Sequence, residues 1–486
     1  MKFGITEWLT KWEKCYNFAD MKKVLIITYY WPPSGGSGVQ RWVKFAKYLP
    51  QNGWQPVIYT PENPEFTTID RTLEDDVPEE AVILKRPIFE PYGIYRRLFG
   101  KGDVPVVAGE DAADIRENIR IKERKSEVAE VNPINAQEKS LGQKISLWIR
   151  GNFFIPDPRC LWIRPSVHFL KKYLKEHPVD VIVSTGPPHS MHLIAQKVAA
   201  ATCIPWVADF RDPWTKMFYF KHLELTPWAE RKHERLEKGV LDGADVVVAV
   251  SPLVQEEFKE LTDTPVELIT NGYDEDDFDD ADKEMRVSEE ETGSENEELF
   301  NVVHTGLFAA DGNPLGLWRV LAEIAASDSE FASKLCIRLS GKTDIQIVDS
   351  IVDAGLGKHL VNLGYVSHDE AVREQCGASI LILPLRQEPE YRATLPGKLF
   401  EYLASRRPVL GIGQTDGAMA QVLADAHAGV TFDWDDAAGM KAEILRCWSL
   451  FREGKLNDNN EDIERYSRRR LTQQMARLFD SLSSRN

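Results

Sequence analysis

The most specific chemical pattern lies near the C-terminal end, in the stretch LPGKLFEYLAS (395–405). A loop with proline and glycine leads into a predicted helix, with Lys398 in its first turn and Glu401 one turn later on nearly the same face. The helix dipole disfavours a cation at this end, so Lys398 predicts an anion beside it. A diphosphate suits converging N–H groups and an ammonium, and Glu401 could accept two hydrogen bonds from a ribose diol. The alternative is a surface Lys–Glu pair.

A second pattern lies near the N-terminal end, where the glycine-rich turn WPPSGGSGVQRW (31–42) follows a predicted strand. Such a turn lets backbone N–H groups face an anion or a hydroxyl-rich ligand. The dinucleotide fingerprint would need a further glycine where Arg41 stands, and it would need an acidic residue roughly twenty positions later. Both are missing, which disfavours a nicotinamide cofactor. The alternative is a tight turn without a ligand.

Two polar loops complete the set of candidate residues. GPPHS (186–190) places His189 between a strand and a helix, where a histidine can act as a base or as a hydrogen-bond donor. DFRDPW (209–214) places a carboxylate on either side of Arg211. The alternatives are a capping or packing role for His189 and a local Asp–Arg pair that holds the second loop.

Alternating strands and helices must position these loops. Apolar runs such as KKVLIITYY (22–30), VDVIVSTG (179–186) and LFNVVHT (299–305) are predicted strands, each followed by a helical pattern. This order is typical of βαβ units with a parallel sheet. We therefore predict the α/β class, with two Rossmann-like, doubly wound domains. Ligands of such sheets bind outside the carboxyl ends of the strands, so we expect the two domains to share a cleft.

The pattern divides the 486 residues into five parts. We expect a leader that could be an interfacial helix or a frayed segment before Met21, a first domain with a flexible insertion, an acidic linker, a second domain and an amphipathic helix. Their expected ranges are 1–20, 21–284 with the insertion at about 100–140, 285–298, 299–465 and 466–486.

Composition excludes several classes of protein. At 43% hydrophobic and 28% charged residues the chain is typical of soluble globular proteins. The net charge is −17, of which residues 274–298 contribute −12 through six Asp and eight Glu against two basic residues, so we expect no nucleic-acid partner. The six cysteines form no CxxC pair, which argues against zinc and a disulfide framework and predicts a cytoplasmic protein. No apolar run approaches the ~20 residues of a membrane-spanning helix.

Taken together and in order, the motifs resemble the retaining GT-B glycosyltransferases of the group 1 type, family four of the sequence classification. Their glycine loop resembles the stretch SGVQRW. The segment that leads into their second domain resembles ADVVVAVSPLVQEEF followed by ITNGYD. Their nucleotide-sugar element resembles PGKLFEYLASRRPVL. The resemblance covers nearly everything from Met21 onwards. It implies transfer of a hexose from a UDP- or GDP-sugar to a hydroxyl of a glycan or lipid-linked acceptor, in cell-surface polysaccharide synthesis.

The resemblance also implies roles for individual residues. Lys398 would stabilise the departing diphosphate, and neither a metal nor another cofactor is expected because protein cations neutralise the leaving group. The implied catalytic residues are His189, Arg211, Asp212 and Lys398; the donor-binding residues are Gly36, Gly38, Lys342, Arg392, Gly397, Lys398, Leu399 and Glu401; and the acceptor-binding residues are Gln40, Arg41 and His189.

The chain departs from the family pattern in three places. The first of the family's two glutamates falls on Ala393, which leaves the donor sugar open. The family's Arg and Lys are missing from HTGLFAADGNP (304–314), so Lys342 or Arg392 would have to assist Lys398. Arg211 stands where the family has a histidine. The competing interpretations are a GT-B sugar-nucleotide epimerase and a non-catalytic scaffold; a phosphorylase is disfavoured because no cofactor-lysine site is found.

Two segments interleave aromatic residues with arginine, YRRLFGKG (95–102) and WIRGNFFIPDPRCLWIRP (148–165). Such segments suit the surface of an anionic membrane. We therefore expect a cytoplasmic protein with possible peripheral association at the inner face of the membrane. The alternative is an ordinary buried crossover with exposed arginines.

Overall fold

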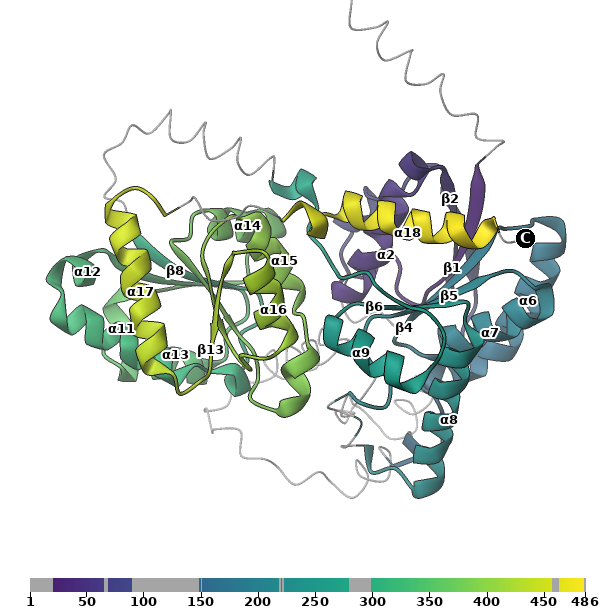
Figure 1. The fold of residues 1–486 in the computed structure, drawn as a ribbon, viewed down its shortest axis with the longest axis horizontal. Helices are drawn as coiled ribbons and strands as arrows, with labels where there is room; N and C mark the ends of the chain where they lie inside the picture. The colour runs from purple at the N-terminus through teal and green to yellow at the C-terminus, as the bar shows by residue number, and fades with distance from the viewer. Residues whose placement is uncertain are drawn as a thin grey trace, which may run out of the picture. The chain divides into compact units, whose positions relative to one another are not determined.

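The computed structural model describes residues 21–64, 69–89, 148–149, 151–217, 220, 223–278, 299–456 and 463–484. It contains two compact units, each built around a sheet with helices packed on it, which confirms the α/β class (Figure 1). The predicted leader, insertion and acidic linker lie outside the described residues. Unit 1 comprises Met1–Val248, Phe258–Glu267 and Thr472–Asn486, and unit 2 comprises Ala249–Glu257 and Leu268–Leu471.

The sheet of unit 1 has seven strands in the order β3-β2-β1-β4-β5-β6-β7. The inner strand β1 pairs in parallel with both β2 and β4, and its apolar residues from Val24 to Ile27 are completely buried. Strands buried on both faces read as continuous apolar runs, which is why the sequence predicts them well. The strands are β1 (Lys22–Ile27), β2 (Trp54–Pro61), β3 (Val82–Arg86), β4 (Val181–Gly186), β5 (Trp206–Phe210), β6 (Val246–Ala249) and β7 (Val266–Leu268).

Helices connect these strands as crossovers. The first of them, α2, begins directly after the glycine turn, and its wide apolar face is buried in the core. The helices in this half of the chain are α2 (Ser37–Tyr48), α6 (Ile163–Glu176), α7 (Ser190–Thr202), α8 (Pro227–Gly243) and α9 (Pro252–Leu261).

The sheet of unit 2 has six strands in the order β10-β9-β8-β11-β12-β13, all paired in parallel. The strand order reverses beside β8, so the adjacent carboxyl ends of β8 and β11 form the switch point where ligands of such sheets bind. The strands are β8 (Phe300–Thr305), β9 (Leu335–Ser340), β10 (Leu360–Gly364), β11 (Ile380–Pro384), β12 (Val409–Ile412) and β13 (Gly429–Phe432).

Two separate apolar cores lie on the two faces of this second sheet (Figure 1). Helices α11, α13 and α17 cover one face, and α14, α15 and α16 cover the other. The helices of this half are α11 (Leu315–Ser327), α12 (Ser329–Lys334), α13 (Ile345–Asp353), α14 (His368–Cys376), α15 (Gly397–Ala404), α16 (Ala418–Asp425) and α17 (Ala437–Arg452).

The predicted C-terminal helix is present as α18 (Arg468–Ser483), but most of it belongs to unit 1. Its Phe479 ring packs edge-on against Trp54 at a centroid distance of 5.3 Å, and Asp480 pairs with Lys22 at 2.9 Å. The long continuous part of unit 2 begins at Leu268, before the boundary expected at residue 284, and unit 2 also includes Ala249–Glu257. The amphipathic pattern predicts the helix itself, whereas only packing decides which core its apolar face covers.

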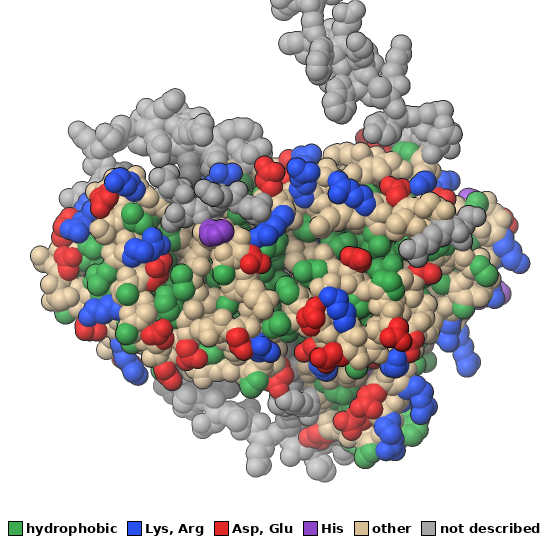
Figure 2. Space-filling view, in the orientation of Figure 1, with side chains coloured by type: hydrophobic (Ala, Val, Ile, Leu, Met, Phe, Trp, Pro, Cys, Tyr) green, Lys and Arg blue, Asp and Glu red, His purple; other side chains and the backbone are tan. Residues whose placement is uncertain are grey.

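Acidic and basic side chains are interspersed over the face shown in Figure 2, without a continuous basic stripe. A nucleic-acid interface would gather Lys and Arg along one surface to neutralise phosphates.

Candidate functional site

The predicted residues Lys398 and Glu401 both connect to Thr305, the last residue of β8. The Lys398 ammonium donates to Thr305 O at 2.6 Å and to Leu307 O at 3.2 Å, and its Nζ lies 3.3 Å from His304 Nε2. His304 is buried, and burial followed by the charge of Lys398 lowers its pKa well below the ordinary value. The imidazole is therefore neutral near pH 7, so its Nε2 can accept from the ammonium.

Glu401 is held from the other side of Thr305 by Gln375. The side chain of Gln375 is completely buried, and its Nε2 donates to Thr305 Oγ1 at 3.0 Å and to Glu401 Oε2 at 3.1 Å. Its Oε1 has no hydrogen-bond partner among the described residues. A buried amide that bridges a strand end and a carboxylate fixes the direction of that carboxylate. Nothing in the local sequence pattern of α14 marks Gln375, so the sequence alone does not predict its role.

Two glycines form the turn beside this cluster. Gly306 has a φ of 84°, and a Cβ there would lie 3.3 Å from Lys398 Nζ. Gly341, at the end of β9, has a φ of 124°, and a Cβ there would lie 2.3 Å from Gly306 O. Only glycine allows both the positive φ and this close approach. The result is a compact backbone turn in which Lys398 contacts the chain directly.

The other predicted donor-binding residues differ in their burial and in their contacts. Gly397 begins α15, and a Cβ there would meet nothing within 4 Å, so the helix N-terminus is open at this point. Lys342 lies in the adjacent turn, where its carbonyl accepts from Phe308 N at 2.9 Å. Arg392 forms an exposed ion pair with Asp416 at 2.9 Å. The side chain of Leu399 is completely buried in the core, which favours a packing role over the predicted donor contact.

His368, which stands in no recognisable sequence motif, lies near Glu401. His368, at the start of α14, shares a hydrogen bond with Asp277 at 3.3 Å. That hydrogen bond, helped by the charges of Glu401 and Asp277 against partial burial, raises the pKa of His368 to about 9. The imidazolium form therefore predominates at pH 7 and adds a positive charge beside this part of unit 2. The segment that supplies Asp277 is far away in sequence, which is why no local pattern predicts the pair.

In unit 1 the predicted acceptor residue Arg41 faces the core. Its guanidinium binds Asp209 through Nη2 at 2.8 Å and Nε at 3.2 Å, and both side chains are at most 1% exposed. Trp42 Nε1 and Thr185 Oγ1 also donate to Asp209 at 2.8 and 2.9 Å. This geometry favours a structural role for Arg41 over the predicted contact with an acceptor. Asp209 pairs with Arg41 instead of the neighbouring Arg211.

The predicted catalytic residues His189 and Arg211 lie together beyond β4 and β5. The His189 ring is 4% exposed and stacks on Trp214 at a centroid distance of 4.4 Å, and neither ring nitrogen has a hydrogen-bond partner among the described residues. Burial, followed by the nearby charges of His192, His233 and Arg211, lowers the pKa of His189 well below its ordinary value. His189 is therefore neutral, with one donor and one acceptor nitrogen.

Arg211 connects the loops of this region. Its Nη2 donates to the carbonyl oxygen of Pro187, and its guanidinium lies over the ring of Tyr30 at 5.5 Å. Arg211 thereby joins the loops that follow β1, β4 and β5. Asp212, the neighbouring predicted residue, is half-buried.

The glycine loop of unit 1 is formed as the sequence predicts. Gly36, with a φ of 102°, is the N-cap of α2, and Gly38 is buried in the first turn. Gln40 is half-buried on the same turn. The positive φ of Gly36 explains the glycine at this position in terms of the backbone alone.

The aromatic segment 148–165 divides into exposed and buried parts. Trp148, Phe153 and Leu161 are exposed, whereas Trp162 is buried and the buried Arg159 lies over the ring of Tyr29 at 4.5 Å. The segment is thus neither a plain buried crossover nor fully at the surface. The second predicted segment, 95–102, lies outside the described residues.

No group of three or more His, Cys, Asp or Glu side chains in the described part of the chain could hold a metal ion. In the same residues no helix is both long and apolar enough to cross a membrane.

Family models match both halves of the chain. Residues 130–277 match glycosyltransferase family 4, and residues 301–449 match the glycosyl transferases group 1. No curated protein matches the sequence of the chain.

Several solved structures share the fold. A glycosyltransferase from Rickettsia africae is 13% identical and has a TM-score of 0.56, with 97% of this chain and all of that chain covered. Sucrose-phosphate synthase from Thermosynechococcus elongatus is 14% identical with a TM-score of 0.57, and covers 96% of this chain and all of its own. HepE of Anabaena, solved in complex with UDP and glucose, is 14% identical with a TM-score of 0.55, and covers 95% of this chain and all of its own.

The two family models match in the predicted order, and the neighbours share the two-sheet architecture. The chain therefore belongs to the GT-B glycosyltransferases of the group 1 and family 4 type, and is a glycosyltransferase.

Proposed function

We propose that the chain moves a hexose from a UDP- or GDP-sugar to a hydroxyl group of a glycan or lipid-linked acceptor, with retention of configuration, in the synthesis of a cell-surface polysaccharide. The arrangement around Thr305 carries the proposal. An ammonium, a carboxylate held by a buried amide and a glycine turn meet at one strand end. These groups suit a diphosphate and a ribose diol.

In the proposed reaction the bond between the anomeric carbon and the diphosphate breaks while the acceptor oxygen bonds to the same carbon. The acceptor proton passes to the departing diphosphate, so no side chain need act as a strong base. Lys398 Nζ contacts three acceptors among the described residues, and an ammonium has three N–H groups. To bind the diphosphate, Lys398 must therefore give up at least one of these hydrogen bonds. The weakest by distance is the one to His304, at 3.3 Å.

We further propose that the enzyme works in the cytoplasm, at the inner face of a membrane, without a metal. Support for the location comes from the exposed aromatic side chains of segment 148–165. Large amphipathic rings prefer the interface between water and lipid. Lys398 and the open N-terminus of α15 supply the positive charge that a metal would otherwise provide.

Thermal unfolding against UDP-, GDP-, ADP-, TDP- and CMP-sugars tests the donor class. A nucleotide sugar at one hundred times its dissociation constant should stabilise the protein by ~2.7 kcal/mol. Release of the nucleoside diphosphate in the presence of an acceptor extract then measures transfer. Stabilisation by a donor without any turnover would favour the scaffold interpretation. Production of an altered nucleotide sugar without an acceptor would favour the epimerase.

Replacing Gln375 by leucine should weaken donor binding because Glu401 loses the amide that directs it. A hydrogen bond to a charged group contributes about 1.5–3 kcal/mol, so we expect the KM for the nucleotide sugar to rise by roughly 10- to 100-fold. Gln375→Glu is the informative partner variant, because it keeps the size but places a second carboxylate beside Glu401. Equal KM values for the wild type and both variants would contradict the positioning role.

Replacing Gly397 by alanine should separate ligand binding from folding. A Cβ at this position meets nothing within 4 Å in the chain, and alanine is the better helix former. We therefore expect an unchanged or slightly higher free energy of unfolding, together with weaker donor binding if the ligand approaches the backbone there. Gly454→Ala is the contrasting control, since its φ of 66° makes the substitution strained without affecting the donor. An unchanged affinity in Gly397→Ala would place the donor elsewhere.

A further inference from the structure

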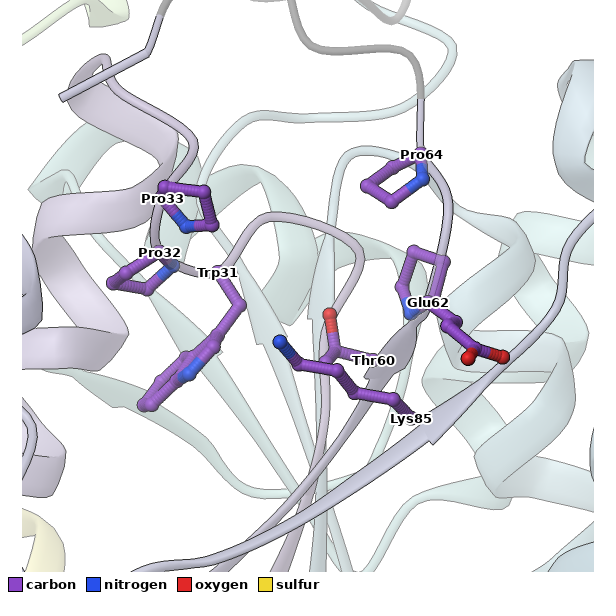
Figure 3. Close-up of a pocket in the computed structure, with 8 residues that line it drawn as sticks. Trp31, Pro32, Pro33, Thr60, Glu62, Pro64 and Lys85 are labelled. Carbon is purple, nitrogen blue, oxygen red and sulfur yellow. The ribbon is translucent and has the colours of Figure 1, made fainter. Parts of the chain in front are cut away.

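A pocket of about 250 Å³ lies at the carboxyl ends of β1, β2 and β3 in unit 1 (Figure 3). None of its residues is among the predicted site residues, although three of them begin the glycine-rich turn of residues 31–42. Its walls are mostly rigid and apolar, and its two ionisable residues are Glu62 and Lys85. The lining residues are Trp31, Pro32, Pro33, Thr60, Pro61, Glu62, Pro64 and Lys85.

The two ionisable side chains differ in direction. Figure 3 shows the Lys85 side chain extending across the pocket towards Trp31, whereas the carboxylate of Glu62 points away from it. No ion pair joins them within the described residues, and the side chain of Lys85 has no hydrogen-bond or ion-pair partner among these residues, although its backbone pairs with β2. Of the two ionisable side chains that line the pocket, only the Lys85 ammonium is therefore directed across it.

Strand geometry explains why Lys85 alone takes this place. Successive side chains of a strand point to opposite faces, so Lys85 and Arg86 at the end of β3 diverge. Arg86 lies over the ring of Phe169 at 4.8 Å. Two other lysines of unit 1, Lys44 and Lys47, both pair with Asp76 at 2.8 and 2.9 Å. Lys85 thus differs from these neighbouring cations, which all have partners.

We propose that this pocket binds an anionic group, a phosphate or a carboxylate, carried by the acceptor sugar. The inference rests on the proposed function, because the carboxyl edge of the first sheet is where we expect the acceptor. Pro33 and Pro64, both half-buried, offer apolar contacts to a sugar ring, and the Lys85 ammonium offers a charge-assisted hydrogen bond to the anion. Lys85 is itself exposed, so the charge-assisted hydrogen bond must carry the attraction.

Calorimetric titration of the full chain tests the inference without any nucleotide. The probes are hexose 6-phosphates, hexuronates, the matching neutral hexoses and inorganic phosphate. We expect either the hexose phosphates or the hexuronates to bind at least about tenfold more tightly than the neutral hexoses. Comparing these two groups of probes shows whether the pocket prefers a phosphate or a carboxylate. Lys85→Gln should remove this preference, and Lys85→Arg should retain most of it. Lys172→Gln, an exposed lysine on α6, is the matched control and should behave as the wild type.

The possible outcomes separate the two proposals. Equal binding of neutral and anionic hexoses, or an unchanged preference in Lys85→Gln, would overturn the inference while donor turnover still tests the enzyme. If inorganic phosphate binds as tightly as the hexose phosphates, the claim that the anion is carried by a sugar would be overturned. Anion binding that depends on Lys85 in a protein without donor turnover would uphold the pocket and refute the transfer reaction.

Discussion

Replacement of Lys398 by alanine is expected to lower kcat/KM for the nucleotide sugar by about 10²–10³-fold, since a preorganised donor to developing charge contributes roughly 3–4 kcal/mol. This loss should exceed the loss from replacing any other single lysine by alanine, because the Lys398 ammonium lies at the proposed donor site, where it donates to Thr305 O and Leu307 O at the end of β8. The measurement is steady-state release of the nucleoside diphosphate, with thermal unfolding in parallel.

Lys441→Ala is the control for removal of a lysine from unit 2. Its ammonium pairs with Glu323 at 2.8 Å in an exposed position, so the variant should keep full activity. Lys398→Arg tests whether charge alone suffices, because the larger guanidinium must fit beside Gly306. Activity of Lys398→Ala within threefold of the wild type would remove Lys398 from the reaction, and the proposed donor site with it.

Replacement of Asp209 by asparagine is expected to lower the free energy of unfolding by about 3–5 kcal/mol. The substitution leaves the guanidinium of Arg41 buried without its counter-charge, and both side chains are at most 1% exposed. Chemical denaturation of the wild type and the variant measures the difference at pH 7. Asp242→Asn is the control, because Asp242 pairs with Lys238 at the surface and should contribute less than about 1 kcal/mol.

The same pair predicts a pH dependence. Burial opposes ionisation of Asp209, but the charge and hydrogen bonds of Arg41, with those of Trp42 and Thr185, outweigh it and lower its pKa below the ordinary value. A carboxyl whose folded pKa is lowered contributes stability above its unfolded pKa of about 3.9, and this contribution is lost as the pH falls through the folded pKa. The difference between wild type and Asp209→Asn should therefore be constant from pH 7 to about 5 and shrink below about 4. A difference that grows on acidification would contradict this account.

Much of the fold can be predicted from the sequence because its signals are local. Continuous apolar runs predict buried parallel strands, and the glycine turn at residues 35–38 marks the start of α2. The same local logic places Lys398 and Glu401 one turn apart on α15, and the structure brings both to Thr305. The roles assigned to the site residues remain predictions, since they depend on ligands.

Some residues stand in a recognisable motif yet take their role from distant partners. Arg41 lies in the glycine loop and was predicted to bind the acceptor, but it turns inward because Asp209, 168 positions later, supplies a buried carboxylate. Gln375 has no motif at all, and it becomes part of the candidate site only because α14 packs beside β8 and α15. Contacts of this kind depend on how crossovers bring strand ends together, which local patterns do not encode.

Local signals in the chain are enough to predict the α/β class, two successive Rossmann-like patterns, the glycosyltransferase family and the lysine and glutamate of α15. These features follow from hydrophobic period, turn chemistry and helix spacing within short windows. The folded chain adds three features that no short window contains: α18 packs on unit 1, Arg41 binds a buried carboxylate of the core, and Gln375 and His368 flank Glu401. Each of these contacts joins residues that are distant in the sequence. They form because a buried charge or polar group is costly unless it has a partner, and only the folded chain brings the partners together.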